Sequence, residues 1–170
     1  YFSAYDGVHG IELWKSDGTE AGTTMVADIG TVSYGSNVVS LVTISGISYF
    51  GANDGSSTGD KLWRSDGTAA GTYVVKATNP IGSSMISQLT VAGGMFFFEA
   101  YNDTTGRELW KSDGTTAGTV LVKDIYPGWG ATSLGNLTAA GSTLYFAASD
   151  GTNGNELWKS DGTAAGTVML

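Results

Sequence analysis

Short apolar stretches alternate along the whole chain with clusters of Gly, Asp, Ser, Thr and Asn. The segments 23–29 and 49–52 are typical, because aromatic and β-branched residues in them are enclosed by turn-forming ones. No segment keeps a 3.6-residue apolar period over the roughly ten residues that a helix needs. The pattern therefore predicts many short strands joined by tight turns.

One phrase, ELWKSDGT, occurs three times letter for letter, and a fourth copy reads KLWRSDGT. The tryptophans of successive copies are 49, 47 and 48 residues apart, a period typical of propeller blades. Repeat units are expected at approximately 1–38, 39–85, 86–133 and 134–170, within a single domain over residues 1–170.

Each repeat unit divides into four strands, except that the first unit lacks its opening strand. The opening strands are expected at 42–46, 89–93 and 137–141, and the second strands at 1–4, 49–52, 97–100 and 145–148. The repeated phrase forms the third strand. The fourth strands are expected at 23–29, 72–77, 119–125 and 167–170, which makes 15 strands in all.

The third strand is apolar on both sides. Leu13 and Trp14 are adjacent, so their side chains point to opposite faces of the sheet. Such a sheet must be covered on both faces, and a propeller blade between two neighbours satisfies this condition. A β-helix is the alternative, but four strands in about 48 residues are long for one coil. The expected fold is all-β, a β-propeller-type array of about four four-stranded antiparallel blades.

The end of the phrase, Ser-Asp-Gly-Thr, is typical of a hairpin turn. Gly tolerates positive φ, and Asp and Ser side chains bond nearby backbone amides. Because the turn is copied in every unit, a structural role is favoured over a single active site. The expected structural hairpin residues are Trp14, Asp17, Gly18, Trp63, Asp66, Gly67, Trp110, Asp113, Gly114, Trp158, Asp161 and Gly162.

These turns resemble the Asp-box hairpins of sialidase-like propeller blades. More specifically, the chain resembles the bacterial ELWxxDGT repeat family over nearly its whole length. The resemblance implies a secreted or surface-attached repeat protein, and hence an extracellular or cell-surface location. The second repeat departs from the pattern, with Lys61 in place of Glu and a longer loop at 54–60. Asp60, one place earlier, is the candidate for the missing carboxylate.

Charge and composition narrow the range of partners. The net charge is −8 with only 8 Lys and Arg residues, which disfavours nucleic acid and anionic membrane as partners. The sequence has no Cys, which excludes disulfides, thiolate metal sites and a cysteine nucleophile. No apolar run approaches the ~18 residues of a membrane span.

Acidic pairs precede the phrase in three repeats, with a Gly between the two carboxylates. They are Asp6 and Glu12, Asp103 and Glu108, and Asp150 and Glu156. Hard oxygen ligands of this kind could hold calcium, although the spacing differs from an EF-hand loop. The alternative is a Glu bonded to backbone amides or to a Lys. We expect no cofactor, with calcium as the lesser alternative.

Three aromatic residues, Tyr34, Tyr126 and Trp129, lie in loops where they could stack on sugars. Ile81 falls in the same repeat position as Tyr34 and Trp129 and cannot stack, so packing between blades is the competing interpretation. Glu99 breaks a column of small residues and requires a partner, for which Arg107 is the candidate.

The expected function is non-catalytic. Sialidase-like catalysis needs a cluster of arginines, whereas the chain has only Arg64 and Arg107, and His9 is its one histidine. Because the first unit lacks a strand, open edges are expected to pair with further blades or with other chains. The sequence thus predicts a structural or adhesion scaffold, a homo-oligomer or filament formed by edge-strand completion, and the family resemblance implies that it is extracellular. A carbohydrate-binding, lectin-like propeller is the alternative.

Overall fold

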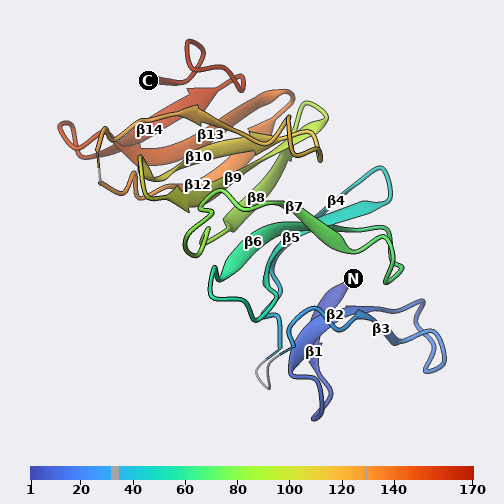
Figure 1. Cartoon of the computed structure of the whole chain (residues 1–170). Coiled ribbons are helices and arrows are strands. Elements are labelled where there is room, and N and C mark those ends of the chain that lie inside the picture. The colour runs from blue at the N-terminus through green and yellow to red at the C-terminus, as the bar shows by residue number, and fades with distance from the viewer. Residues whose placement is uncertain (32–34, 129) are drawn as a thin grey trace. The chain divides into compact units, whose positions relative to one another are not determined.

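The computed structural model describes residues 1–31, 35–128 and 130–170. The chain divides into two compact units, Tyr1–Ile86 and Ser87–Leu170, and each is treated by itself. The described residues form 15 strands in four antiparallel sheets and no helix (Figure 1). Among these residues, accordingly, no helix is available to cross a membrane. The all-β prediction and the number of strands are confirmed, whereas the single domain over 1–170 stays a prediction.

The unit Tyr1–Ile86 holds two sheets. The first sheet consists of β1 (Phe2–Tyr5), β2 (Ile11–Lys15) and β3 (Thr24–Ala27). The second sheet consists of β4 (Val39–Ile44), β5 (Ile47–Asn53), β6 (Asp60–Ser65) and β7 (Tyr73–Lys76). In both sheets the spatial order of the strands is their order in the sequence, as tight hairpin connections require.

The unit Ser87–Leu170 repeats this arrangement with two complete sheets. The third sheet consists of β8 (Ser87–Ala92), β9 (Met95–Asn102), β10 (Gly106–Ser112) and β11 (Val120–Lys123). The fourth sheet consists of β12 (Gly135–Ala140), β13 (Thr143–Ser149), β14 (Asn155–Ser160) and β15 (Val168–Met169). Each of the four sheets is an open antiparallel meander.

The repeated phrase sets the register of every sheet. Its tryptophan lies directly opposite a phenylalanine of the preceding strand, an aromatic cross-strand pair that stabilises the hairpin. The four pairs are Phe2 with Trp14, Phe50 with Trp63, Phe98 with Trp110, and Phe146 with Trp158. On the other side of the third strand the register shifts between Leu and Trp, at the same place in the first three sheets.

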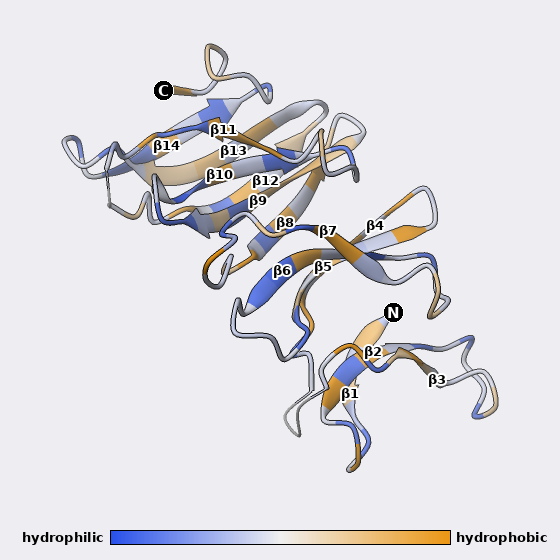
Figure 2. Cartoon of the chain, viewed as in Figure 1, coloured by the Kyte–Doolittle hydropathy of each residue, from blue (hydrophilic) through white to orange (hydrophobic). Residues whose placement is uncertain are grey.

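Leucine and tryptophan of the phrase bury opposite faces of the sheets. In the first unit, Leu13 of the first sheet packs in one cluster with Phe50, Ala52 and Trp63 of the second sheet. In the second unit the cluster around Leu109 has the same composition at equivalent positions, namely Phe146, Ala148 and Trp158. The leucine therefore faces the following sheet and the tryptophan faces the preceding one. Figure 2 shows β13, which carries Phe146, in hydrophobic colours along much of its length.

A backbone irregularity recurs where the opening strand pairs with the second strand. The ladder is interrupted between Val39 and Val42, and at the equivalent places in β8 and β12. Each interruption contains a non-glycine residue with positive φ, namely Ser40, Gln88 and Asn136. Such a residue bends the strand locally, as in a β-bulge. The apolar pattern did not predict this feature.

The exposed Leu157 offers a matched test of this packing. Leu109→Ala should lower the free energy of unfolding by about 2–5 kcal/mol, because it removes a side chain with no exposed surface. Leu157→Ala, at the same position of the phrase in the fourth sheet, should cost about 0.5 kcal/mol or less, because Leu157 is 54% exposed. Urea unfolding of dilute protein measures both. Equal losses would contradict the assignment of faces.

Candidate functional site

The Ser-Asp-Gly-Thr turn is a closed hydrogen-bond system in all four sheets. In the first sheet, Asp17 Oδ1 accepts bonds from the amide of Thr19 at 2.9 Å and from its hydroxyl at 2.8 Å. The Thr19 hydroxyl in turn accepts a bond from the amide of Gly22. The same three bonds recur at Asp66, Asp113 and Asp161. The amide and hydroxyl of Thr19 hold the pKa of Asp17 below its ordinary value.

The position before the fourth strand requires glycine, because the aspartate side chain lies where a Cβ would be. A Cβ on Gly22 would overlap the Asp17 carboxylate, and the same holds at Gly71, Gly118 and Gly166. The aspartate, the threonine and this glycine therefore form one unit. Their polar atoms are used to shape the hairpin, and Trp63 and Trp158 anchor it in the core clusters.

A buried glutamate of the phrase clamps the segment that leads to the next sheet. Glu12 has no exposed surface, and its carboxylate accepts bonds from the amides of Ile29, Gly30 and Ser36 at 2.9–3.0 Å. The Ser36 hydroxyl donates a fourth bond at 2.7 Å. These donors follow β3, so the side chain on β2 fixes where the chain departs from the first sheet. We call this arrangement the glutamate clamp.

The third sheet has the same clamp. Glu108 is fully buried and accepts bonds from the amides of Ile125 at 2.9 Å and Tyr126 at 3.1 Å. Desolvation raises the pKa of Glu108 from its ordinary value of 4.5 to about 8, although the two amide bonds oppose this shift. The nearby carboxylates of Asp124 and Glu99 act in the same direction as burial. Glu108 is thus held in a site that disfavours its charge.

In the second sheet, where the phrase has Lys instead of Glu, a serine hydroxyl serves as the acceptor. Ser84 Oγ accepts bonds from the amides of Thr78 at 2.9 Å and Asn79 at 3.3 Å. These amides are equivalent to those of Ile29 and Gly30. Asp60, expected to supply the missing carboxylate, instead contributes its backbone: its carbonyl accepts from the amide of Ser84. The expectation for the Asp60 side chain was wrong, because the acceptor arises from the returning segment.

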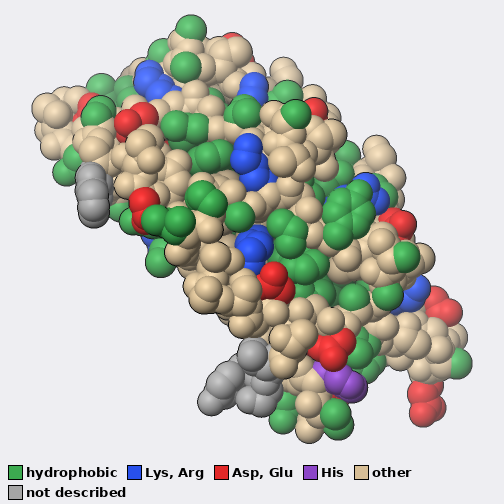
Figure 3. Space-filling model, in the orientation of Figure 1, with side chains coloured by type: hydrophobic (Ala, Val, Ile, Leu, Met, Phe, Trp, Pro, Cys, Tyr) green, Lys and Arg blue, Asp and Glu red, His purple; other side chains and the backbone are tan. Residues whose placement is uncertain are grey.

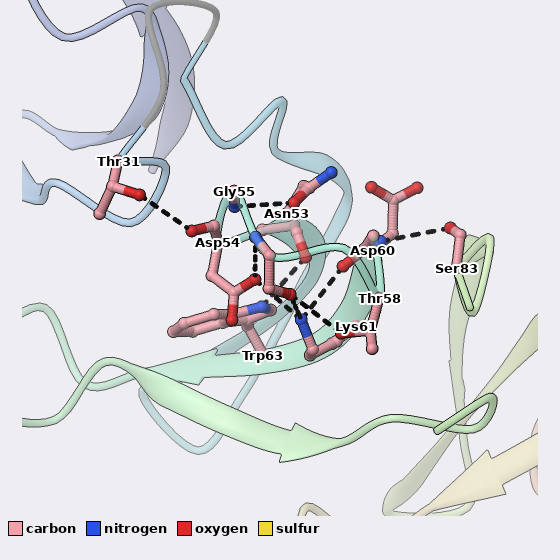
Figure 4. A network of polar contacts seen from close by, with 12 residues as sticks. Thr31, Asn53, Asp54, Gly55, Thr58, Asp60, Lys61, Trp63 and Ser83 are labelled. Atoms are coloured by element: carbon pink, nitrogen blue, oxygen red, sulfur yellow. Dashed lines mark hydrogen bonds and ion pairs between the residues drawn. The ribbon is translucent and has the colours of Figure 1, made fainter. Parts of the chain in front are cut away.

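Lys61 is buried and is neutralised within its own loop. Figure 4 shows its ammonium surrounded by the loop between β5 and β6. It donates to Asp54 Oδ1 at 2.8 Å, to Ser56 Oγ at 2.8 Å and to the carbonyl of Gly59 at 3.2 Å. Against the effect of desolvation, the Lys61 bond and the Ser56 bonds lower the pKa of Asp54 to about 2. The longer loop of this repeat therefore supplies acceptors for the lysine.

The carboxylates proposed as calcium ligands have separate partners. Asp6 accepts bonds from the amides of Val8 and His9, and its second oxygen lies 2.6 Å from His9 Nδ1. This contact raises the pKa of His9 and lowers that of Asp6. Glu12 is engaged in its clamp. Within the described ranges no group of three or more His, Cys, Asp or Glu side chains could hold a metal ion.

The remaining acidic candidates are also dispersed. Asp150 accepts bonds from the amides of Thr152 and Asn153 and from the Asn153 side chain. Asp103 and Glu156 are exposed, in contrast to the buried Glu12 and Glu108. The pairs Asp103–Glu108 and Asp150–Glu156 thus place their members in different environments.

The predicted ion pair at Glu99 is confirmed. Arg107 Nη1 lies 3.4 Å from Glu99 Oε2, and the Ser87 hydroxyl donates to the same oxygen at 2.6 Å. The Glu99 side chain is only 7% exposed, so the serine and the arginine together compensate its desolvation. These contacts join β8, β9 and β10 within the third sheet.

The aromatic candidates give little support to a sugar platform. Tyr34 and Trp129 lie outside the described residues. The Tyr126 ring is covered by backbone, because a Cβ on Gly130 or on Gly151 would overlap it. Its ring face is therefore occupied by the chain itself, which agrees with a packing role.

A shallow hollow lies beside the turn in the first, third and fourth sheets. Its wall is formed by Lys, Ser and Asp of the phrase and by the Ala-Gly that precedes the fourth strand. In the first sheet these residues are Lys15, Ser16, Asp17, Ala21 and Gly22, and the third and fourth sheets repeat them. In the third and fourth sheets the serine hydroxyls are buried and bonded within the turn. The lysine and the aspartate that line the hollow there are polar groups that suit a small polar ligand.

Searches for related proteins found no match among family models, curated proteins or solved structures.

The close approach of aspartate and glycine in the turn can be tested by a double-mutant cycle. Gly118→Ala should lower the free energy of unfolding by about 1–3 kcal/mol, because the added methyl displaces the Asp113 carboxylate. In an Asp113→Ala background the same change should cost less, since the overlap is gone. Chemical unfolding of the four proteins gives the coupling energy. Additive losses would contradict a direct contact between the Asp113 carboxylate and the methyl group added at position 118.

Burial of Glu108 predicts a specific pH dependence. The folded state holds the Glu108 proton more tightly than the unfolded state, so this group lowers the free energy of unfolding as pH rises from about 4.5 to about 8. Glu108→Gln removes the titration. The unfolding free energy of the variant, measured relative to the parent in urea, should therefore rise across this range.

The exposed Glu156 provides the control for this measurement. Glu156→Gln makes the same change at the equivalent position of the phrase and should follow the parent closely. A difference between Glu108→Gln and the parent that is constant from pH 5 to about 8 would contradict the raised pKa.

Proposed function

We propose that the protein is a non-catalytic scaffold whose four sheets are consecutive blades of a propeller-type array. The observation that carries this proposal is the use of the repeated residues. Glu12 and Glu108 hold the backbone that leads to the next sheet, and the four aspartates hold their own turns. The most regular polar groups of the chain thus serve its architecture.

Contacts between opening strands support the propeller. In the second unit β8 and β12 lie against each other. Gln88 Nε2 donates to the carbonyl of Leu134 at 2.7 Å, and Thr90 Oγ1 donates to that of Leu137 at 3.3 Å. In a propeller the opening strands of neighbouring blades approach one another around the central channel, whereas the outer strands diverge. The opening strand of each sheet would accordingly be the innermost.

A scaffold of this kind works through assembly and through its surface. The resemblance to the ELWxxDGT family supports a location outside the cell. In the first sheet β1 is an edge strand. An open edge of this type can accept a strand from another chain. Self-association through an edge strand is part of the proposed function.

The charge distribution supports partners other than polyanions. The net charge is −8, and on the face drawn in Figure 3 the Lys and Arg side chains stand apart from one another. Nucleic-acid binding relies on concentrated basic surface. The proposed partners are copies of the same chain, or other proteins at the cell surface.

Carbohydrate binding is the second candidate function, and the hollow beside the turn favours it. A site repeated on several sheets could bind a repetitive polar ligand at several points at once. The hollow would then replace the aromatic loops as the place of contact.

The two functions predict different results for the purified chain. Scaffolding predicts self-association, seen in light scattering as whole multiples of the chain mass with rising concentration. A monomer at every concentration would contradict it. Carbohydrate binding predicts signals on a glycan array, weakened about tenfold by Lys111→Ala in the third-sheet hollow. An empty array at high protein concentration would remove the second candidate.

A further inference from the structure

We propose that Asp6–Gly7 is a site of spontaneous isoaspartate formation, and that a hydrogen bond to the glycine amide protects the other aspartyl–glycyl steps of the chain. This modification is independent of the proposed scaffold function, since it requires only the chain itself and water. In an isoaspartate the main chain runs through the side-chain carbonyl carbon, so the backbone gains one carbon atom at that position.

The reaction begins when the backbone nitrogen of the glycine attacks the carboxyl carbon of the aspartate side chain. A C–N bond forms, the carboxyl hydroxyl and the amide proton leave together as water, and a succinimide ring results. Water then adds to a ring carbonyl, the C–N bond at that carbon breaks, and the nitrogen takes up a proton. Opening at the backbone carbonyl gives isoaspartate, and the composition of the chain is unchanged. Glycine favours the attack because it has no Cβ to hinder the approach.

Six of the seven aspartyl–glycyl steps share one hydrogen bond. The residue before the aspartate is Ser or Asn, and its side-chain oxygen accepts a bond of 2.8–3.2 Å from the glycine amide. The donors are the amides of Gly18, Gly55, Gly67, Gly114, Gly151 and Gly162. Figure 4 shows the bond from Gly55 to Asn53. The arrangement thus occurs in the four turns of the phrase and in two loops outside it.

This hydrogen bond engages the atom that would attack. The amide must give up its acceptor before the nitrogen can reach the carboxyl carbon, and this loss adds to the barrier. In the phrase the target is held as well, because Asp113 Oδ1 accepts bonds from the hydroxyl and the amide of Thr115 at 2.7 and 2.9 Å. These two bonds lower the pKa of Asp113 and keep its carboxyl group ionised. An ionised carboxylate is a poor target, since the oxygen that leaves must carry a proton.

Asp6–Gly7 lacks the bond to the glycine amide. The preceding residue is Tyr5 instead of Ser or Asn, and the Gly7 amide has no hydrogen-bond partner within the described part of the chain. The Asp6 carboxylate itself is held, because it accepts bonds from the amides of Val8 and His9 at 2.8 Å. Asp6–Gly7 therefore differs from the phrase in its nucleophile, which is the group that the proposal concerns.

The one asparaginyl–glycyl step of the chain, Asn153–Gly154, is subject to the same chemistry. Its preceding residue is Thr152, and among the described residues no group accepts a hydrogen bond from the Gly154 amide. Ring closure there expels ammonia from the side-chain amide instead of water. The product is aspartate or isoaspartate, which places a second carboxylate where Asn153 Nδ2 now donates to Asp150 Oδ2 at 2.7 Å.

Peptide mapping of the purified chain after storage at neutral pH tests the proposal. Chromatography and fragmentation in the mass spectrometer give the isoaspartate fraction at each of the seven aspartyl–glycyl steps. The fraction at Asp6 should exceed that at each of the other six by about threefold or more, the effect of one hydrogen bond on a rate. Equal fractions at all seven steps would overturn the proposal.

Tyr5→Ser supplies the missing acceptor and should lower the isoaspartate fraction at Asp6 by about threefold or more. Tyr5→Phe is the matched control, because it changes the same side chain, which is 66% exposed, without adding an acceptor near the amide. Thermal unfolding checks that both variants are folded. If Tyr5→Ser and Tyr5→Phe isomerise equally at Asp6, the protective role of the preceding side chain is wrong.

Ser112→Ala makes the opposite change in a turn of the phrase. It removes the acceptor of the Gly114 amide, which lies 2.9 Å from Ser112 Oγ, and should raise the isoaspartate fraction at Asp113 by about threefold. The three unchanged turns of the same chain are the internal controls. An unchanged fraction at Asp113 would contradict the role of the serine, and an equal rise at all four turns would show unfolding instead of local protection.

Discussion

In the first three sheets a buried hydrogen-bond acceptor holds the backbone that follows the last strand, and the path of the chain out of each sheet depends on it. Two successive backbone amides that follow the fourth strand of the repeat are buried. Each would cost about 1–3 kcal/mol if it had no hydrogen-bond partner. Glu12 and Glu108 satisfy them with one carboxylate each. Since the same segment carries the opening strand of the next sheet, the acceptor also fixes where that strand begins.

The second sheet shows that this position requires an acceptor and not a charge. The Ser84 hydroxyl accepts hydrogen bonds from the two amides there, and Lys61 on β6 stands at the phrase position where the other repeats have Glu. A buried ammonium must be compensated, which explains why the preceding loop is longer and contributes Asp54, Ser56 and a carbonyl. The lysine at position 61 and the longer loop before it are therefore coupled by one physical requirement, the compensation of a buried ammonium.

The sequence predicted the features that depend on local pattern. Periodicity and turn chemistry predict the strand positions, the opposite faces of Leu13 and Trp14, and the aspartate turn. The cost of burying a carboxylate predicts the ion pair of Glu99 with Arg107. Features that depend on approach of distant segments were not predicted. Ser84 reaches its amides only after the chain has turned back. The positive φ of Ser40 and Gln88 has no local signal, because neither residue is a glycine or an asparagine.

The asymmetry of the sheet joint has a consequence for how repeats can be added. Its two halves are unlike, with leucine on one side and tryptophan and phenylalanine on the other. A leucine face cannot pair with another leucine face in this way, so every further sheet must join in the same direction. Contacts of this heterologous type generate a closed ring when the rotation between neighbours closes and a filament when it does not. Under the proposed scaffold function, the angle between neighbouring sheets therefore decides whether such sheets would form a ring or a filament.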